Sequence, residues 1–202
     1  MKKKAQNSIN YSVIILAAGK SSRMGLPKWS LQFDKSTSFI EHITNEYYRV
    51  GCKEIILVIN ETDYSSFVGK NYILQENVKV VINKQPEWDR FYSLKLGVNE
   101  LEKVQPVFIH NVDNPFVNPV ILSSLVENNA GFDIIVPEYE GRGGHPILIS
   151  QQIIQEVLFR QENILHLKEF LSKFKKLKVR VNDDKILVNI NSMEEYNQYF
   201  KS

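Results

Sequence analysis

Short apolar runs alternate with longer segments of helical periodicity along nearly the whole chain, and this alternation restricts the possible folds more than any other feature. The runs occupy residues 13–17, 55–59, 78–82, 107–112, 132–137 and 147–150. Strands that are apolar on both sides of the backbone are buried on both faces, and the helices between them provide crossover connections. We therefore predict an α/β fold, a three-layer α/β/α sandwich around a mostly parallel, mixed sheet.

The segments between these runs carry the spacing of amphipathic helices. Helical periodicity extends over residues 40–50, 90–101, 118–128, 151–159 and 164–174, and a last helix follows residue 192. Ser38 with Glu41, and Ser192 with Glu195, have the spacing of a capping box, which marks the first turn of a helix. Shorter apolar runs predict two further strands, at 177–181 and 186–190.

Length and composition indicate one globular domain. The chain has 202 residues, 43% hydrophobic and 24% charged, so it can bury a substantial core. We expect residues 11–202 to form a single domain and residues 1–10 a flexible N-terminal tail. A net charge of +2 does not indicate nucleic acid or a membrane as a partner. The one cysteine, Cys52, favours a reducing compartment, and no apolar run reaches transmembrane length, so we expect a cytoplasmic protein.

Ligands of open α/β sheets usually bind beyond the carboxyl ends of the strands. This rule selects four loops, which follow Ala17, Ile82, Val112 and Ile190. The first of these loops is rich in glycine, serine and basic residues: Gly19, Lys20, Ser21, Ser22, Arg23, Gly25 and Lys28.

The composition of this first loop suits a polyphosphate ligand. Gly19 and Gly25 allow backbone conformations that turn several N–H groups toward an anion. Arg23 can hold phosphate oxygens with a planar fork, and Lys28 contributes a point charge. The spacing is neither that of a Walker loop nor that of a dinucleotide-binding loop. On spacing alone, a strand-to-helix loop with surface charges is an equally good interpretation.

The stretch "LAAGKSSRMGLPK" resembles the signature L-A-A-G-x-S-x-R-M-G-x-x-K of the MobA-like NTP transferase family. The matching residues are Leu16, Ala17, Ala18, Gly19, Ser21, Arg23, Met24, Gly25 and Lys28. The resemblance implies a nucleotide-diphospho-sugar transferase (GT-A, Rossmann-like) fold and a loop, Ser22 included, that wraps the triphosphate of an NTP. It also implies that Arg23 and Lys28 are catalytic and contact the phosphates.

Two segments are candidates for a Mg²⁺ site. Asp113 follows an apolar run, and a carboxylate is a hard oxygen ligand that suits Mg²⁺. The family has an aspartate, any residue and a proline here, which implies that Asp113 binds the metal and is catalytic; the same residue types also favour a turn. "LVNINSMEEY" is similar to the segment with the second metal ligand, which implies Asn191, with Asn189 as the alternative. A capping role for Asn191 beside Ser192 also remains open.

Two branches of the family that act on the molybdenum cofactor are distinguished by short motifs. Asn189 and Asn191 resemble the N-x-N of the guanylyltransferase branch, where the cytidylyltransferase branch has D-x-D. "EGRGGHPILIS" resembles the G-H-P segment of the cytidylyltransferase branch, which implies that Gly144, His145 and Pro146 lie on the acceptor side. A tight turn with a hydrogen-bonded histidine is the alternative.

The stretch "NKQPEWDRFYSLKLGV" resembles the family segment near the nucleobase, which implies that Asn83 and Ser93 bind the nucleotide. The glycine usual in this segment is absent around residues 89–90. The aromatic residues of the stretch suit the core as well as stacking on a base: Trp88, Phe91 and Tyr92.

The resemblance implies a Mg²⁺-dependent nucleotidyltransferase, closest to molybdenum cofactor cytidylyltransferase. It would transfer NMP from an NTP, with CTP as the expected donor, to the phosphate of an acceptor such as molybdopterin, and release pyrophosphate. A phosphomonoester is largely dianionic at neutral pH and attacks without a general base. The alternatives are GTP as donor, a sugar or alditol phosphate as acceptor, and a nucleotide-binding protein with little catalysis.

Overall fold

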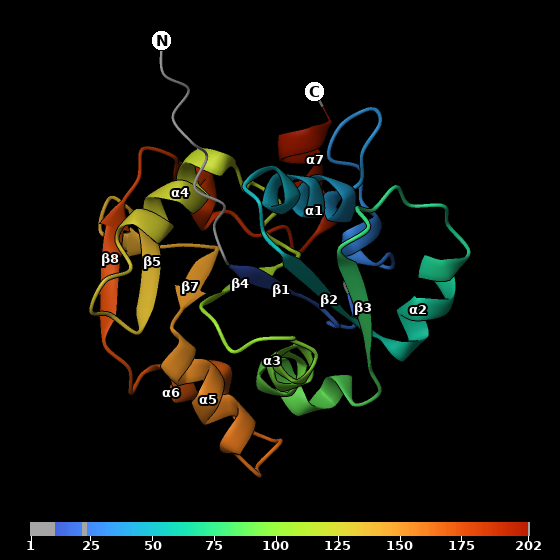
Figure 1. The fold of residues 1–202 in the computed structure, drawn as a ribbon. Helices are drawn as coiled ribbons and strands as arrows, with labels where there is room; N and C mark the ends of the chain where they lie inside the picture. The colour runs from blue at the N-terminus through green and yellow to red at the C-terminus, as the bar shows by residue number, and fades with distance from the viewer. Residues whose placement is uncertain (1–10, 22–23, 202) are drawn as a thin grey trace.

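The computed structural model describes residues 11–21 and 24–201, which form an eight-stranded sheet with helices on both faces (Figure 1). The strand order is β3-β2-β1-β4-β7-β5-β6, and β8 pairs with β5. The strands are β1 (Ser12–Ala17), β2 (Glu54–Asn60), β3 (Val78–Asn83), β4 (Val107–Asn111), β5 (Ile134–Tyr139), β6 (Arg142–Gly143), β7 (Ile147–Ile149) and β8 (Lys176–Arg180). The tail predicted for residues 1–10 lies outside the described residues.

The first four strands are parallel and form one half of the sheet. β1 pairs with both β2 and β4, with Leu16 opposite Asn111, so β1 and β4 end side by side. β7 runs antiparallel between β4 and β5, and β8 runs parallel to β5. The predicted mostly parallel, mixed sheet is confirmed, and its order brings the loops after β1 and β4 together near the middle of the sheet.

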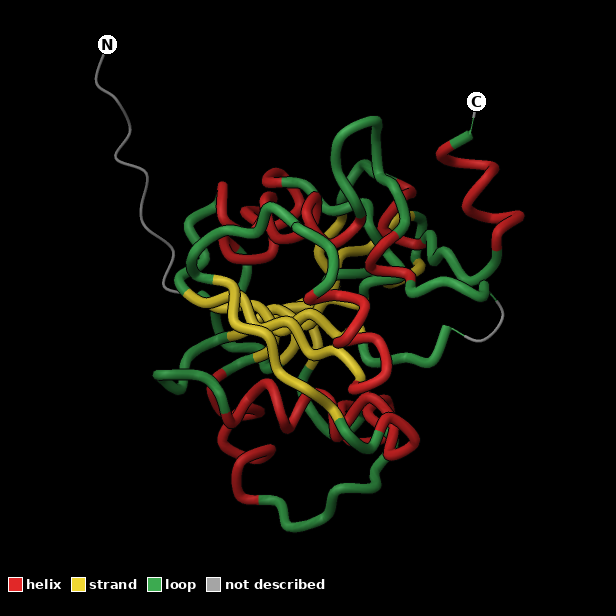
Figure 2. The backbone as a smooth tube through the Cα atoms, turned by 90° about the vertical axis from the view of Figure 1, so that its right-hand side faces the viewer, coloured by secondary structure: helices red, strands yellow, loops and turns green. Residues whose placement is uncertain are grey.

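Helices cover both faces of the sheet, which confirms the predicted three-layer sandwich. Figure 1 shows α1 and α4 on one face and α3, α5 and α6 on the other, and Figure 2 shows the strands as a twisted layer between helices. The helices are α1 (Phe39–Arg49), α2 (Glu61–Val68), α3 (Asp89–Asn99), α4 (Pro119–Glu127), α5 (Gln151–Phe159), α6 (Leu167–Leu171) and α7 (Met193–Phe200). Within the described residues, none of them has the length and apolar character that crossing a membrane requires.

Side chains of the central strand β1 alternate between two cores, one beneath each helical layer. Val13 and Ile15 belong to the core that includes α1 and α4, whereas Ile14 and Leu16 belong to the core that includes α3 and α5. Helix α3 approaches β1 closely because it has Gly97 at the contact, where a Cβ would lie 2.6 Å from Ile14. This contact fixes how the start of α3 lies relative to the end of β1.

Both predicted capping boxes are present. The N–H of Glu41 donates to Ser38 Oγ at 3.4 Å, and the N–H of Ser38 donates to Glu41 Oε2 at 2.8 Å. Ser192 and Glu195 form the same reciprocal pair at the start of α7. The second box fixes the direction in which the chain enters α7, directly after Asn191.

The strand predicted at residues 186–190 is wrong. A 3-10 helix, η3, covers Asp184–Leu187 instead, and the residues after it are not paired with a strand. The Ile186 carbonyl accepts from the side chain of Asn114 and from the backbone N–H of His145. These partners take the place of a neighbouring strand, so Ile186 is buried without joining the sheet.

The helix predicted at residues 164–174 is shorter than expected and covers only Leu167–Leu171. The Nζ of Lys95 donates to the Arg160 carbonyl at 2.7 Å and to Asn163 Oδ1 at 2.9 Å, which holds the preceding segment as a loop. Helix α2 and the two-residue strand β6 lie in segments for which the sequence predicts no element.

Candidate active site

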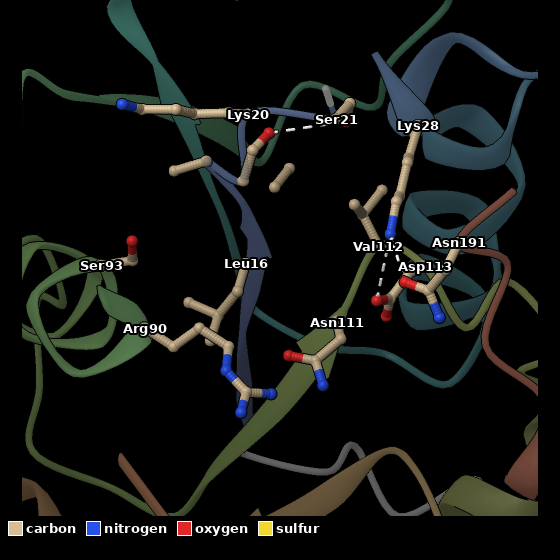
Figure 3. Close-up of a pocket in the computed structure, with 13 residues that line it drawn as sticks. Leu16, Lys20, Ser21, Lys28, Arg90, Ser93, Asn111, Val112, Asp113 and Asn191 are labelled. Atoms are coloured by element: carbon tan, nitrogen blue, oxygen red, sulfur yellow. Dashed lines mark hydrogen bonds and ion pairs between the residues drawn. The ribbon is translucent and has the colours of Figure 1, made fainter. Parts of the chain in front are cut away.

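A cavity of about 320 Å³ lies at the carboxyl ends of β1 and β4 (Figure 3). Four segments that are far apart in the sequence line it: the first loop, the start of α3, the end of β4 and the stretch before α7. The lining residues are Leu16, Ala17, Ala18, Gly19, Lys20, Ser21, Lys28, Arg90, Ser93, Asn111, Val112, Asp113 and Asn191. The structure therefore brings most of the described residues predicted for nucleotide and metal into one cavity.

Lys28 connects the two residues predicted to bind Mg²⁺. Its Nζ donates to Asn191 Oδ1 at 2.6 Å and lies 3.4 Å from Asp113 Oδ2 (Figure 3). The side chains of Lys28 and Asp113 are only 16% and 26% exposed. One cation and two hard oxygen ligands thus meet at a single point of the cavity wall.

A short buried segment fixes the backbone of Lys28. The 3-10 helix η1 (Lys28–Ser30) follows Pro27, whose extended conformation ends the first loop. The next residue, Trp29, is 1% exposed and makes edge-on contacts with Phe67 and Tyr72. Because a buried tryptophan anchors η1 to the core, the adjacent Lys28 is held at the cavity.

Buried hydrogen bonds tie the loop after β4 to the segment before α7. The side chain of Asn114 is fully buried, and its Nδ2 donates to three carbonyls within residues 185–188, the shortest bond being 2.5 Å to Val188. The N–H of Ile190 donates to the Asp113 carbonyl at 2.7 Å. The backbone positions of the two predicted metal ligands are therefore coupled through direct contacts.

His110 supports the same loop from inside the core. Its Nε2 lies 2.8 Å from the Asn114 carbonyl, and its Nδ1 lies 3.0 Å from the hydroxyl of Tyr47. A carbonyl can only accept, so Nε2 carries the proton and Nδ1 accepts from the tyrosine. Complete burial, with a smaller contribution from His145, lowers the pKa of His110 to about 3. His110 is therefore a neutral structural histidine.

The oxygen ligands fit a Mg²⁺ ion that is bound together with a nucleotide. Asp113 Oδ1 is buried without a hydrogen-bond partner among the described residues, and Asn191 supplies a neutral amide oxygen. Mg²⁺ sites usually combine one or two carboxylates with water and substrate phosphates. Residues 11–21 and 24–201 contain no cluster of three or more His, Cys, Asp or Glu side chains that could hold a metal. The nucleotide phosphates would therefore complete the metal coordination here.

The first loop matches the sequence expectation only in part. Gly25 has a φ of 68°, a conformation that favours glycine. Gly19 has no such φ, contrary to expectation; instead, the space that a Cβ would occupy is open. Met24 is buried in a core cluster and does not line the cavity. Ser22 and Arg23, predicted to bind the triphosphate, lie outside the described residues.

On the α3 side of the cavity, Ser93 lines the wall and Asn83 lies behind it. Ser93 lines the cavity, and the fully buried Asn83 donates from Nδ2 to Ser93 Oγ at 2.9 Å. Of the three aromatic residues in this stretch, Phe91 is fully buried in the core, while Trp88 and Tyr92 pack edge-on against each other. The core interpretation therefore holds for Phe91.

A second cavity of about 420 Å³ adjoins the first. Gly144 and His145 line it, and the two cavities share Arg90 and Asn111. The Nδ2 of Asn111 lies 3.2 Å from His145 Nε2. Burial lowers the pKa of His145, and the nearby Asp113 carboxylate opposes this effect. The predicted acceptor-side histidine is thus a half-buried neighbour of the predicted nucleotide site.

Three further residues are predicted for the acceptor side or the metal: Gly144, Pro146 and Asn189. A Cβ on Gly144 would collide with the Ile186 carbonyl, so only glycine fits there. Pro146 follows a cis peptide bond and does not line the second cavity. Asn189 lines a separate groove beside Tyr199. Of the two asparagines considered as metal ligands, only Asn191 faces the first cavity.

Arg90 and Asn111 line the first cavity but are not among the residues predicted for it. Asn111 lies two positions before Asp113, and the alternation of side chains along a strand could have identified it. Arg90 lies in the first turn of α3, and its place at the cavity depends on how this helix packs on the sheet.

The fold and the cavity together define a class of protein. A mixed sheet of this order, with a cavity at the carboxyl ends of its central parallel strands, is an α/β nucleotidyltransferase fold. The model of the family described as the MobA-like NTP transferase domain matches residues 13–176, and the chain belongs to this family.

Curated relatives with similar sequences include two cytidylyltransferases and one bifunctional enzyme. Molybdenum cofactor cytidylyltransferase of Escherichia coli (strain K12) is 26% identical over 186 residues, which cover 91% of this chain and 92% of that enzyme. The bifunctional enzyme IspD/IspF of Wolbachia pipientis is 27% identical over 190 residues, covering 88% of this chain but only 47%, about half, of that enzyme. 2-C-methyl-D-erythritol 4-phosphate cytidylyltransferase of Bacillus licheniformis is 31% identical over 123 residues, covering 59% of this chain and 52% of that enzyme.

Solved structures share the fold at low sequence identity. Rv0371c from Mycobacterium tuberculosis H37Rv aligns with a TM-score of 0.77 and 19% identity, over 96% of this chain and 100% of that one. A structure of the same protein in complex with manganese aligns with a TM-score of 0.74 and 18% identity over the same shares of both chains. At this level of identity, the likeness shows the fold alone.

Proposed function

We propose that this protein is a Mg²⁺-dependent nucleotidyltransferase that transfers CMP from CTP to the phosphate of an acceptor, with molybdopterin as the expected acceptor. The observation that carries the proposal is the convergence of Lys28, Asp113 and Asn191 on one cavity at the ends of β1 and β4. The choice of CTP and molybdopterin rests on the G-H-P segment at residues 144–146 and on the nearly full-length similarity to the E. coli enzyme.

The proposed reaction forms one P–O bond and breaks another. An oxygen of the acceptor phosphate attacks the α-phosphorus of the NTP. The bond from the α-phosphorus to the oxygen that bridges the β-phosphate breaks, and its electron pair leaves with pyrophosphate. The acceptor dianion has no proton to lose at neutral pH. The protein therefore has to align the two phosphates and offset their negative charge.

Three side chains carry this task in the proposal. Lys28 offsets charge on the departing pyrophosphate; its Nζ already lies in the cavity and can exchange its bond to Asn191 for a phosphate oxygen. Asp113 and Asn191 would hold the Mg²⁺ ion, which when bound neutralises charge on the phosphates. On the motif alone, Arg23 is assigned to the same triphosphate.

The first loop and the start of α3 would enclose the nucleotide from two sides. The open space beside Gly19 allows a phosphate to approach the backbone of the loop closely. Across the cavity, Ser93 is held in place by Asn83 and offers a hydroxyl to the ribose or the base. Neither side chain carries a charge, so these contacts orient the nucleotide without contributing to charge neutralisation.

Transfer of CMP to an alditol phosphate is the second candidate. The specific observation in its favour is the 31% identity to an enzyme named for the substrate 2-C-methyl-D-erythritol 4-phosphate. A GTP donor is a variant of the first candidate, favoured by Asn189 and Asn191 at the positions where the cytidylyltransferase branch has aspartates.

The test is pyrophosphate release from CTP, GTP, ATP and UTP, each with Mg²⁺ and with molybdopterin or a panel of sugar and alditol phosphates. We expect release with CTP and molybdopterin. Asp113→Asn should lower it by roughly 100-fold or more, since an essential charge at the metal is lost. Glu76→Gln, a change at an exposed acid outside the cavities, serves as the control.

Pyrophosphate release with an alditol phosphate as acceptor, but not with molybdopterin, would establish the second candidate. Nucleotide binding without release from any pair would contradict both and would indicate a nucleotide-binding protein with little catalysis.

A further inference from the structure

Arg90 lies where the two cavities meet. It lines both of them, as does Asn111 at the end of β4. Figure 3 shows the Arg90 side chain extending from α3 in the direction of Asn111, on the opposite side of the cavity from Lys28. A group bound at Arg90 would therefore face the proposed triphosphate site around Lys28 on one side and the second cavity on the other.

The guanidinium of Arg90 is available for a ligand. It makes no hydrogen bond or ion pair with any residue in 11–21 or 24–201; only its backbone N–H is engaged, by Asp89 Oδ1 at 2.6 Å. The other oxygen of Asp89 pairs with His166 Nδ1 at 3.0 Å. The Asp89 carboxylate interacts with Arg90 electrostatically, but neither of its oxygens forms an ion pair with the guanidinium.

The backbone before Arg90 is held in an unfavourable conformation. Asp89 has a φ of 67° and a ψ of 178°, in a region that residues with a side chain rarely adopt. Its two carboxylate contacts, to the Arg90 N–H and to His166, stabilise this turn. The turn sets the direction from which the Arg90 side chain leaves the start of α3.

The second cavity has a mainly apolar wall that also includes basic residues. The apolar side chains are Ile109, Ile134, Val136, Ile147, Leu167 and Leu171, and the basic ones are Lys168, Lys176 and Lys178. Hydroxyl groups placed against such a wall would lose hydrogen bonds to water without replacement. The cavity therefore suits a ring with apolar faces better than an open polyol chain.

We propose that Arg90 binds the phosphate of the acceptor at the junction of the two cavities, and that the acceptor is a phosphomonoester whose body is a ring system seated in the second cavity. This inference rests on the proposed function, because the acceptor phosphate must reach the α-phosphorus of the NTP. The planar fork of arginine matches two phosphate oxygens. Arg90 is thus a specificity-determining residue that selects the acceptor.

Steady-state kinetics of Arg90→Gln and Arg90→Lys test this role. We expect Arg90→Gln to raise the KM for the acceptor by about tenfold or more, since a charge-assisted double hydrogen bond is lost, while the KM for the NTP changes less than about twofold. Arg90→Lys should recover part of the loss. Lys84→Gln removes an exposed cation that lines neither cavity and is the matched control. A raised KM for the NTP with an unchanged KM for the acceptor would overturn the inference.

A binding measurement separates this inference from the proposed function. The probe is phenyl phosphate, titrated into the full chain and followed by ³¹P NMR. We expect Arg90→Gln to weaken its binding by about tenfold, and glycerol phosphate to bind the wild type more weakly than phenyl phosphate does. Absence of binding to the wild type, or equal binding to both proteins, would overturn the inference. Binding that depends on Arg90, together with no pyrophosphate release from any pair, would overturn the proposed function alone.

Discussion

At the scale of single residues, Lys28 has two sets of partners that compete. Its Nζ contacts Asn191 and Asp113, the oxygen ligands that would hold a metal, and we propose the same ammonium as the cation for the leaving pyrophosphate. A nucleotide with its Mg²⁺ ion would offer Lys28 phosphate oxygens and offer the two oxygen ligands a stronger cation. In the proposed mechanism, the contact between lysine and aspartate keeps a half-buried charge paired until substrate binds.

Lys28→Ala should affect turnover and metal binding in opposite directions. Removing a cation that stabilises the leaving group should lower kcat/KM for pyrophosphate release by roughly 100-fold. The variant should at the same time bind Mn²⁺, measured by electron paramagnetic resonance without nucleotide, more tightly than the wild type does, because Asp113 has lost its counter-charge. Turnover equal to that of the wild type would remove Lys28 from the mechanism.

Asn191→Asp tests the second metal ligand. A carboxylate in place of the amide adds a negative charge at the site, and metal affinity rises with the number of charged ligands. We expect the Mg²⁺ concentration for half-maximal activity to fall by roughly tenfold. Asn189→Asp, in a separate groove, is the matched control. An unchanged Mg²⁺ dependence in Asn191→Asp would restrict Asn191 to its contact with Lys28.

At the scale of elements, the site depends on two segments that do not belong to any strand. The loop after β4 and the residues before α7 are connected by the side chain of Asn114 and by the bond from the Ile190 N–H to the Asp113 carbonyl. Gly144 packs directly on the same segment at Ile186. These contacts therefore fix the positions of the two predicted metal ligands relative to each other.

Asn114→Ala should loosen both segments at once. Three carbonyls within residues 185–188 would each lose one donor, at a cost of about 2–4 kcal/mol in the free energy of unfolding. Urea denaturation measures this loss, and Asn128→Ala at the exposed end of α4 should change stability by less than about 0.5 kcal/mol. Equal stability of the two variants would show that these bonds do not hold the segments.

Elements that repeat a regular pattern could be predicted from the sequence, and contacts between distant segments could not. The apolar runs at 13–17 and 107–112 predicted β1 and β4, and from them the place of the cavity. The run at 186–190 resembles a strand, but Asn114, 72 residues away, satisfies its Ile186 carbonyl. The position of Arg90 depends on the packing of α3 against β1 at Gly97. No local sequence pattern predicts this packing.

At the scale of the whole molecule, two histidines with lowered pKa values link stability to pH. Burial lowers the pKa of His110 to about 3 and also lowers the pKa of His145 from the ordinary value of 6.5. Below pH 6.5 the unfolded chain therefore binds protons that the folded chain does not. Acid thus favours unfolding, and the stabilisation that these histidines provide at neutral pH is lost as the pH falls toward the folded-state pKa values.

The free energy of unfolding should consequently fall between pH 7 and pH 5, with a slope of up to about 1.4 kcal/mol per pH unit for each such histidine. Urea titrations at several pH values measure it. His110→Gln should be less stable at pH 7 but show a smaller slope. A slope in this variant as steep as in the wild type would mean that His110 does not cause the pH dependence.

At the same scale, we propose that two adjoining cavities at the carboxyl ends of β1 and β4 join a nucleotide to a phosphate acceptor. The most direct measurement uses CTP labelled either at the α- or at the γ-phosphate, with Mg²⁺ and molybdopterin. We expect the α-label to move to the acceptor and the γ-label to leave in pyrophosphate. Transfer of the γ-label to the acceptor, or retention of both labels in CTP, would contradict it.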